Sequence, residues 1–407
     1  MRQPVDIVVP VYRGEAETRA CLGSVLASGG ARAFEVTVID DASPEPAISS
    51  WLRTLAAEGR ISLVAHEANR GFVASVNEGM ERHPLRDVLL LNSDTEVAPG
   101  WLDRLAAHAD SDAAIGSVTP FSNNATLCSY PRTLDANALP AGESVASLDA
   151  AFAAANAGRH EDIFTAVGFC MYIPRRCLER VGTFDLARYG VGYGEEVDFC
   201  MRAARAGFRH VIAGDVFVKH VGEVSFRGAG SERRAEAQAL VDSLYPEFQV
   251  SLKAFLAADP LRALRRRADL ERLRRSRRAI ELVIGARAPG TPVASGHELL
   301  LLQTGAGGQL SLRWLREGEE FALDNPAGGD AREIAAALAS ITLEKVRVEG
   351  ATPLPAALME VPAVHDALQC AQARNLVEEL RAQARKRGLV ARLSLRLRRL
   401  LSSLRRG

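Results

Sequence analysis

Several polar side chains directly after apolar runs could hold a metal ion. The apolar run at 88–91 is followed by Asn92, Ser93 and Asp94, and the run at 211–218 leads to His220. A carboxylate at the end of a buried strand can coordinate Mg²⁺ or Mn²⁺ whose other ligands are substrate phosphates. Taken alone, the triplet is typical of a turn in which the Asp bonds its own backbone, and a lone His is more often structural.

A second group of acids could act on a proton. Glu195, Glu196 and Asp198 lie within four residues, directly after a stretch with glycines at 190, 192 and 194. One carboxylate facing a substrate would serve as a general base, with a pKa set by its neighbours. The alternative is a helix whose first turn carries acids because the helix dipole favours them there. Three acids behind a glycine-rich stretch favour the catalytic interpretation.

A third set of residues suits a nucleotide. Asp40 and Asp41 follow an apolar run, and adjacent acids there can accept hydrogen bonds from a base N–H or from ribose hydroxyls. Pro10 and Tyr12 end the first apolar run, where a planar base could lie against backbone and ring. Asn69 precedes a predicted helix and would either position a phosphate or cap that helix. Each of these patterns is also typical of ordinary turns.

The elements that carry these residues alternate between strand and helix. Strands are predicted at 5–12, 34–43, 61–67 and 87–97, and helices at about 15–28, 46–59 and 72–83. This alternation predicts an α/β fold with a mostly parallel, doubly wound sheet. Ligands of such sheets bind beyond the carboxyl ends of the strands, near the point where the strand order reverses. The polar strand-end residues should therefore gather at one edge of the sheet.

Later segments are predicted in less detail. Further strands are expected at 115–121, 164–174 and 210–222, and a helix is expected from the acid stretch to residue 207. The pattern changes after residue 228, and residues 259–281 are dense in arginine. We expect four parts: a domain built on the doubly wound sheet at 1–250, a basic helical linker at 251–297, a small α/β segment at 298–370, and a basic amphipathic helical tail at 371–407.

Taken together, the strings resemble glycosyltransferase family 2, which has the GT-A fold. They follow the family's order over about residues 4–228: VPVYR, VIDDAS, NRGFVASVNEG, LLLNSDTEVAPGWL, VGFCMYIPRR, GYGEEVDFCMRAARAG and VKHVG. The combination is highly specific, although each piece alone is weak. The strings look most like the bacterial branch that builds surface polysaccharides, including rhamnosyltransferase-like members. Residues 297–350 vaguely resemble the opening of a GT-B domain, which would make them a truncated appendage.

The resemblance implies a role for each candidate residue in the donor site. Pro10, Tyr12, Asp40 and Asp41 would hold the base and ribose, with Asn69, Asn92 and Ser93 beside them. Asn92-Ser93-Asp94 stands where the family carries its DxD motif, so Asp94 would bind Mn²⁺ or Mg²⁺ and His220 would complete the site. The first acid of the motif is replaced here, which is a departure from the family pattern.

The resemblance also implies the reaction. Glu196 stands where the family usually has the Asp that acts as general base, with Glu195 and Asp198 as alternatives. The enzyme would be an inverting hexosyl- or deoxyhexosyltransferase that moves a sugar from a nucleotide-diphosphate sugar to a hydroxyl of a glycan or lipid-linked acceptor. Cell-surface polysaccharide synthesis is the expected setting. The donor base and sugar are not specified by the sequence.

Two other functional classes compete with this interpretation. A catalytically inactive donor-binding scaffold of a polysaccharide-assembly complex would explain the missing first acid of the metal motif. A nucleotidyltransferase also uses a doubly wound sheet with acids and a metal, but it normally has a glycine-rich phosphate loop after the first strand. The segment VPVYRGEAET contains a single glycine, which disfavours that class.

Composition bounds the location and the partners. The chain has 407 residues, six cysteines without a CxxC pair, and no net charge. Residues 1–250 are acidic and residues 251–407 are basic, so the basic tail could contact an anionic membrane as a peripheral protein. No apolar run reaches the roughly 18 residues that span a bilayer, and no signal peptide is recognised at the N-terminus. We expect a cytoplasmic protein, with the inner membrane face as a contact, and no nucleic-acid partner.

Overall fold

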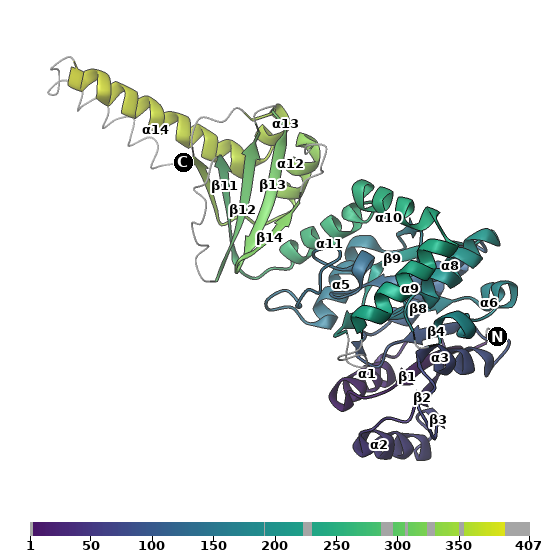
Figure 1. Ribbon diagram of the computed structural model, residues 1–407. Coiled ribbons are helices and arrows are strands. Elements are labelled where there is room, and N and C mark those ends of the chain that lie inside the picture. Colours follow the sequence, from purple (N-terminus) through teal and green to yellow (C-terminus); the bar gives the residue numbers. More distant parts are fainter. Residues whose placement is uncertain are drawn as a thin grey trace. The chain divides into compact units, whose positions relative to one another are not determined.

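The computed structural model describes residues 3–190, 192–222, 230–285, 296–305, 308–323, 330–349 and 354–386 (Figure 1). The chain divides into two compact units, Met1–Arg272 and Leu273–Gly407. The division falls close to the end of helix α11 (Arg262–Arg274). Within the described part of the chain, none of the helices has both the length and the apolar character needed to cross a bilayer.

The first unit is built on an eight-stranded sheet with the order β3-β2-β1-β4-β8-β6-β9-β7. Strands β8 and β7 run antiparallel to their neighbours, and the other pairings are parallel. The mostly parallel α/β sheet predicted from the sequence is therefore confirmed. The strands are β1 (Val5–Val11), β2 (Phe34–Asp40), β3 (Ser62–Ala65), β4 (Val88–Leu91), β6 (Ile115–Phe121), β7 (His160–Ile163), β8 (Cys170–Ile173) and β9 (Arg209–Phe217).

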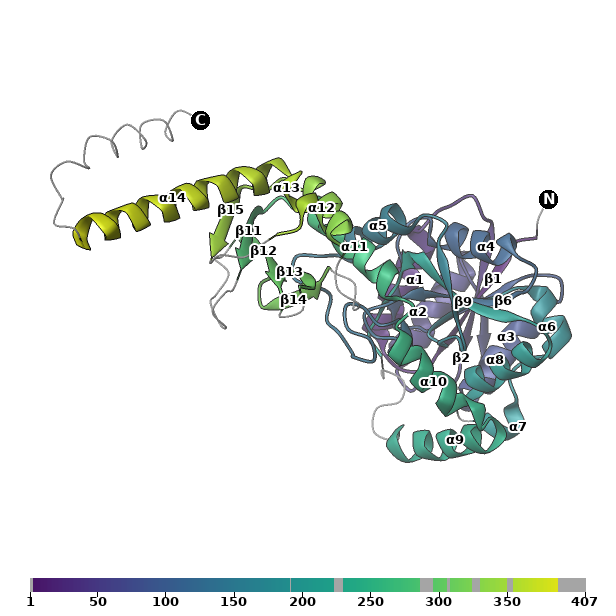
Figure 2. The same ribbon diagram turned by 90° about the horizontal axis from the view of Figure 1, so that it is seen from above.

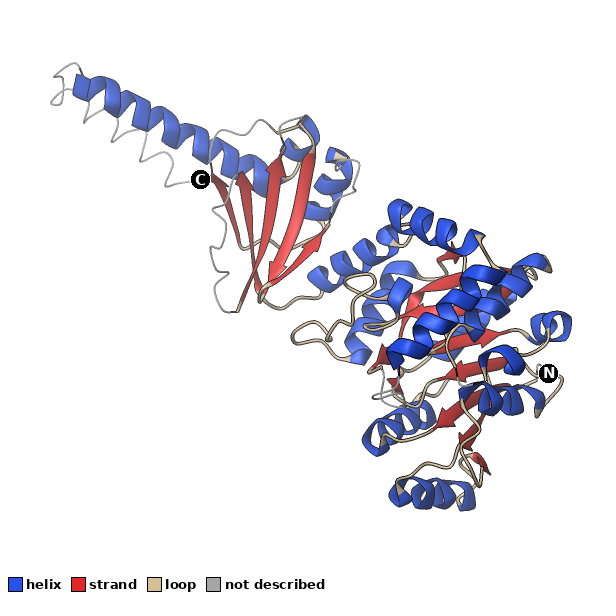
Figure 3. Ribbon diagram, in the orientation of Figure 1, coloured by secondary structure: helices blue, strands red, loops and turns tan. Residues whose placement is uncertain are grey.

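Helices cover both faces of this sheet, as Figures 2 and 3 show. Alternate residues of a strand point to opposite faces, so Ile7 and Val9 of β1 join one apolar cluster and Val8 joins the other. The first cluster includes residues from α1 (Glu15–Ala27), α2 (Pro46–Ala57), α4 (Trp101–Ser111), α5 (Val145–Asn156) and α11. The second includes residues from α3 (Phe72–Glu81), α6 (Arg175–Val181), α7 (Leu186–Tyr189), α8 (Glu195–Arg205), α9 (Gly230–Leu244) and α10 (Glu247–Ala258).

Two of the predicted strands are interrupted. The segment 87–97 forms β4 and then, after a turn, β5 (Thr95–Glu96), and the segment 210–222 forms β9 and then β10 (Lys219–His220). Strands β5 and β10 pair with each other as a separate antiparallel ladder, with His220 opposite Thr95. This short ladder brings the ends of two distant segments together.

The second unit has a five-stranded sheet with the order β14-β13-β12-β11-β15. Strand β11 is parallel to both of its neighbours, while β12, β13 and β14 are antiparallel to one another. The residues with a vague GT-B likeness thus include the β12–β13 antiparallel pair. The elements are β11 (Ala279–Gly285), β12 (His297–Thr304), β13 (Leu310–Arg316), β14 (Glu319–Ala322), α12 (Ala331–Ala339), β15 (Lys345–Glu349), α13 (Ala356–Met359) and α14 (Pro362–Lys386).

The expected basic tail, residues 371–407, begins within helix α14. This helix packs along β15 and runs to Lys386 (Figure 1). The remaining tail residues, 387–407, lie outside the described residues, as do 223–229 in the first unit.

Candidate active site

The β5–β10 ladder brings Asp94 beside His220. The backbone N–H of Val221 donates to the Asp94 carbonyl at 3.0 Å, and that of Gly222 donates to Asp94 Oδ2 at 2.8 Å. The other carboxylate oxygen, Oδ1, lies 3.3 Å from Nε2 of His220. The two residues that the sequence offered as metal ligands therefore meet at the end of β4.

The protonation of His220 follows from its contacts. Its Nδ1 lies 2.5 Å from the carbonyl oxygen of Asn124, which can only accept, so Nδ1 carries a hydrogen. In the neutral ring, Nε2 then presents a lone pair to the Asp94 carboxylate. Burial lowers the pKa of His220, but the hydrogen bond and charge of Asp94 and the Asn124 carbonyl together raise it above its ordinary value. Two facing acceptors require a proton or a cation between them.

This arrangement fits a divalent cation. A metal-binding His commonly donates its other ring N–H to a backbone carbonyl, which fixes the ring orientation. Mg²⁺ is often held by one or two protein ligands plus substrate phosphates. Among the described residues, the one cluster of three or more potential ligand side chains is Asp6, Glu35 and His83, at the start of the sheet, and Arg86 already bonds both of its acids. The Asp94–His220 pair is the better-founded candidate because the two atoms that could bind a metal, Asp94 Oδ1 and His220 Nε2, face one another.

Asn92 and Ser93 lie at the same turn. The Asn92 N–H donates to the Phe169 carbonyl at 2.8 Å, and its carbonyl accepts from Thr95 Oγ1 at 2.9 Å. Its side-chain Nδ2 is 3.5 Å from His220 Nε2, and Ser93 is buried. Asn92 therefore fixes the turn and reaches the pair, but it offers an amide where the family motif has a carboxylate.

Two residues that hold His220 were missed by the sequence reasoning. Asn123 bonds both backbone groups of His220: its Oδ1 accepts from the His220 N–H at 2.9 Å, and its Nδ2 donates to the His220 carbonyl at 3.0 Å. Asn124 contributes the carbonyl that accepts from Nδ1. Both lie just after β6, so a search for polar residues at strand ends, the rule that found Asp94, could have found them.

The acid stretch at the start of α8 divides into three environments. Glu195 is 5% exposed, its Oε2 has no hydrogen-bond partner, and burial together with the charge of Glu196 raises its pKa well above the ordinary value. Glu196 is half-buried, and burial also raises its pKa although nearby backbone N–H groups oppose the shift. Glu196 lies close to Gly168: a Cβ added at Gly168 would be 3.7 Å from the Cβ of Glu196.

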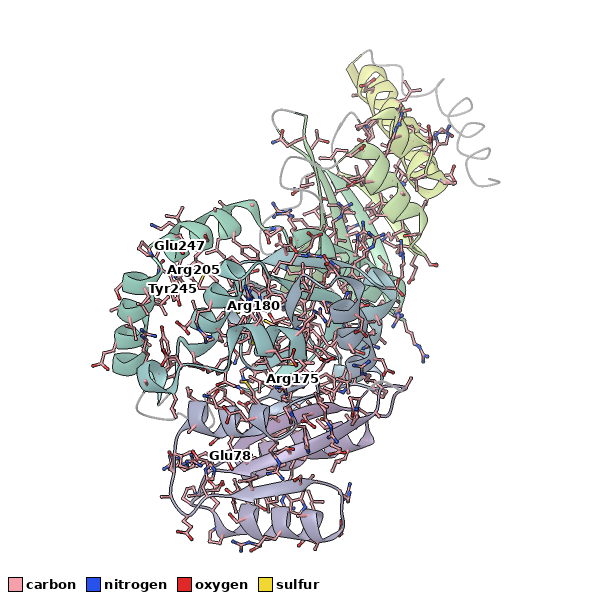
Figure 4. The ribbon with its side chains drawn as sticks, turned by 90° about the vertical axis from the view of Figure 1, so that its right-hand side faces the viewer. Glu78, Arg175, Arg180, Arg205, Tyr245 and Glu247 are labelled. Carbon is pink, nitrogen blue, oxygen red and sulfur yellow. The ribbon has the colours of Figure 1, made fainter. Side chains whose placement is uncertain are left out.

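Asp198 is committed to the fold. Its carboxylate is 1% exposed and accepts from Arg202 Nε at 2.7 Å and from the Tyr245 hydroxyl at 2.6 Å. Arg205 in turn lies over the Tyr245 ring, 4.7 Å from its centre, and pairs with Glu247 at 3.1 Å (Figure 4). These contacts fasten α8 to the beginning of α10, and they leave Glu195 and Glu196 as the acids with free capacity.

Adjacent residues of one segment connect the acid stretch to the Asp94–His220 pair. Gly168 lies against Glu196, and the Phe169 ring stacks on the His220 ring with centres 5.1 Å apart. Neighbouring Cα atoms are about 3.8 Å apart, so Glu196 and His220 contact adjacent residues of one short stretch of chain. Glu196 is therefore in the vicinity of the pair.

The residues expected to bind the nucleotide lie at the ends of two paired strands. Val11 is opposite Asp40 in the β1–β2 pairing, so Tyr12 and Asp41 leave the sheet side by side. Asp40 Oδ1 accepts from the Ser43 N–H at 3.0 Å, and its Oδ2 accepts from the Ser49 hydroxyl at 2.5 Å. A carboxylate has about four acceptor sites, so capacity for a ligand remains.

Asp41 organises the loop that contains Asn69. It accepts from the backbone N–H groups of Arg70 at 2.8 Å and Gly71 at 2.9 Å, and it lies 2.7 Å from His66 Nδ1. The exposed Asn69 side chain reaches the Asp41 carbonyl at 3.4 Å. Pro10 and Tyr12 are partly exposed at the same edge. The edge has the shape expected of a switch point, because β1 is flanked by β2 on one side and β4 on the other.

Comparison with known proteins bears on this site. Residues 6–182 match the sequence model of Glycosyl transferase family 2. The match spans less than half of the 407 residues, and it agrees with the resemblance that the motifs indicate. The chain is also 26% identical over 213 residues to the pre-mycofactocin glycosyltransferase of Mycobacterium tuberculosis, from strains CDC 1551 / Oshkosh and ATCC 25618 / H37Rv. That match covers 50% of this chain and 40% of the relative, so this chain spans less than half the length of the curated relative it matches.

Two solved structures of glycosyltransferases are similar to this chain. A crystal structure of GalNAc-T7 with UDP, GalNAc and Mn²⁺ is 14% identical, covers 58% of this chain and 47% of its own, and has a TM-score of 0.44. The mannosyltransferase PcManGT from Pyrobaculum calidifontis, in complex with GDP-Man and Mn²⁺, is 20% identical, covers 67% and 74%, and has a TM-score of 0.43. The family match and the order of the sheet confirm the expected GT-A fold.

Proposed function

We propose that the first unit is an inverting glycosyltransferase that uses a nucleotide-diphosphate sugar and a divalent metal. The observation that supports this most directly is the pair formed by Asp94 and His220, whose acceptor atoms face one another at 3.3 Å. Asp94 and His220 would hold Mn²⁺ or Mg²⁺ there. When bound, such an ion supplies positive charge that stabilises the diphosphate leaving group.

The chain's own residues account for the other requirements. Pro10, Tyr12, Asp40 and Asp41 stand at the edge where the base and ribose would lie, with Asn69 on the adjoining loop. Glu196, half-buried and with a raised pKa, is the residue we assign as general base. Its carboxylate takes the proton from the acceptor hydroxyl while that oxygen bonds to the anomeric carbon. The bond from that carbon to the diphosphate breaks, and the nucleoside diphosphate leaves on the opposite face of the sugar.

The proposal also names a class of acceptor and a class of donor sugar. We place it among glycans or lipid-linked glycans of cell-surface polysaccharides, and the sugar among hexoses and deoxyhexoses, on the strength of the motif resemblance alone. The basic residues of the C-terminal region support peripheral contact with an anionic membrane, where lipid-linked acceptors are found.

A donor screen tests the proposal. The full chain is mixed with a panel of UDP-, GDP- and dTDP-sugars, and thermal unfolding is measured with and without Mn²⁺. At least one donor should raise the unfolding midpoint more with Mn²⁺ than without it, and should then be hydrolysed slowly in the absence of an acceptor. No Mn²⁺-dependent shift with any donor would contradict the proposal. A clear shift without turnover, even with acceptor extracts, would instead favour the inactive donor-binding scaffold.

A further inference from the structure

Asn123 occupies the position that a neighbouring strand would otherwise take. On one side, the β10 residue His220 pairs with Thr95 of β5. On the other side, the Asn123 amide bonds the N–H and the carbonyl of His220, at 2.9 and 3.0 Å. A side-chain amide that accepts from one backbone group and donates to the other reproduces the hydrogen bonding of a β partner. His220 is thereby held along its backbone from both sides.

Asn123 is itself held in one orientation. Its Nδ2 makes a second bond to the Asn137 carbonyl at 2.9 Å, and the Asn123 carbonyl accepts from the backbone and side-chain nitrogens of Asn137 at 2.9 and 3.1 Å. Asn123 is 7% exposed and Asn137 is 5% exposed. Both amide hydrogens of Asn123 are used, and a buried amide whose bonds are all made is costly to displace.

The same two-residue segment orients the imidazole ring. The Asn124 carbonyl accepts from Nδ1 of His220 at 2.5 Å, which directs Nε2 towards Asp94 Oδ1. If the Asn123 bonds are lost, the backbone of His220 and the carbonyl that sets its ring can move relative to each other. Partners of this kind typically change metal affinity by about 10- to 100-fold when they are removed.

We propose that Asn123 is a positioning residue for His220 and sets the affinity of the first unit for its divalent metal. This inference rests on the proposed function, because it takes Asp94 and His220 as the metal-binding pair. It predicts a specific division of effects: metal binding weakens when Asn123 is replaced, while the chemical step is preserved once the metal is supplied in excess.

Asn77 provides a matched control. Its amide makes the same pair of bonds to another residue, donating to the Phe184 carbonyl at 2.8 Å and accepting from the Phe184 N–H at 3.0 Å. Asn77→Ala therefore removes an equivalent link between side chain and backbone away from His220. Both substitutions should lower the unfolding midpoint, but only Asn123→Ala should affect the metal.

The test is a titration of the full chain with Mn²⁺ alone, in which electron paramagnetic resonance measures the concentration of free Mn²⁺. Asn123→Ala should raise the Mn²⁺ dissociation constant about 10-fold or more, while Asn77→Ala should stay within about threefold of the natural protein. In turnover assays, Asn123→Ala should need more Mn²⁺ but approach the natural kcat at saturation. Equal Mn²⁺ affinity in the two variants would overturn the inference.

Two further variants separate the ways in which the experiment can fail. Asp94→Asn should weaken Mn²⁺ binding most; if it has no effect, the proposed metal site is wrong and Asn123 has no role towards it. If Asp94→Asn weakens binding and Asn123→Ala does not, only the role of Asn123 is rejected. Should Asn123→Ala fail to fold, Asn123→Ser, which keeps a polar side chain but is too short to reproduce both amide bonds to His220, is measured in its place with the same expected direction.

Discussion

Asp94 and His220 lie far apart in the sequence, yet Nε2 of His220 is 3.3 Å from Oδ1 of Asp94. The contact depends on a ladder of only two residues per strand, in which the next pair along is Glu96 with Lys219. Those two side chains form an ion pair at the edge of the site. The ladder thus brings His220 to Asp94, the residue just before β5, so that their acceptor atoms face one another. Beside them lies the Glu96–Lys219 pair, whose charges are already neutralised.

This contrast gives the first prediction. Asp94→Asn should lower kcat/KM by about 100-fold or more, because the loss of a few kcal/mol of charge stabilisation has that effect on rate. Addition of Mn²⁺ should restore little of the loss. Glu96→Gln removes one negative charge from the same ladder without touching His220, and it should change kcat/KM by less than about threefold. Equal losses in both variants would show that the net charge of the ladder matters, rather than the Asp94–His220 pair.

The second prediction concerns the acid that takes the proton. Glu196→Gln should lower kcat by about 10² to 10⁴, the usual contribution of a general base, while the donor-induced thermal shift is retained. Glu195 is buried and its Oε2 has no hydrogen-bond partner, and burial raises its pKa well above the ordinary value, which favours the neutral form that a Gln resembles. Glu195→Gln should therefore cost less than about tenfold in kcat and leave the unfolding midpoint nearly unchanged. The reverse order of effects would move the base to Glu195.

The sequence predicted the sheet well because parallel strands buried on both faces leave a clear record of apolar runs. The prediction of strands from apolar runs failed where the chain turns within one predicted strand. Residues 87–97 were predicted as one strand, but the Thr95 hydroxyl bonds the Asn92 carbonyl and the chain bends between β4 and β5. A two-residue ladder with a distant partner leaves no periodic signal, so the pairing of β5 with β10 could not be derived from the spacing of residues.

The roles of the polar residues stay predictions, because a sequence does not show whether a side chain already has its hydrogen-bond partners. Asp41 was proposed as a nucleotide ligand, and its carboxylate accepts from two backbone N–H groups and His66. Asn123 was passed over because an asparagine in a polar loop is unremarkable in a sequence. Its importance lies in bonds to residues far along the chain, and those depend on how β6 and β9 lie side by side.

The third prediction separates structure from catalysis in the acid stretch. Asp198→Asn places an amide N–H₂ group against donors, since both Arg202 and the Tyr245 hydroxyl donate to this carboxylate. Breaking such a buried pair costs about 3 kcal/mol, which corresponds to a drop of roughly 5–10 °C in the unfolding midpoint of a unit this size. The kcat of the folded fraction should change by less than about tenfold. A loss of turnover without a loss of stability would return Asp198 to the catalytic candidates.

The last prediction concerns acid stability and a histidine that is not among the candidate site residues. His210 is buried, its Nε2 donates to the Cys200 carbonyl at 3.0 Å, and its Nδ1 lies 2.7 Å from the Ser117 hydroxyl. Burial lowers its pKa from 6.5 to about 4, although the Cys200 carbonyl opposes the shift. The unfolded chain thus takes up a proton below pH 6.5 that the folded chain refuses until about pH 4.

Folding stability must therefore fall as the pH drops through this window, by up to about 3 kcal/mol from this residue. His210→Gln removes the titrating group while its amide can still donate to Cys200. The variant should be less stable than the natural protein at pH 7, because it loses the ring and the Ser117 bond, and the difference in unfolding midpoint should shrink or reverse by pH 5. Calorimetry at half-unit pH steps measures it, and parallel curves for the two proteins would show that His210 is protonated equally in the folded and unfolded states.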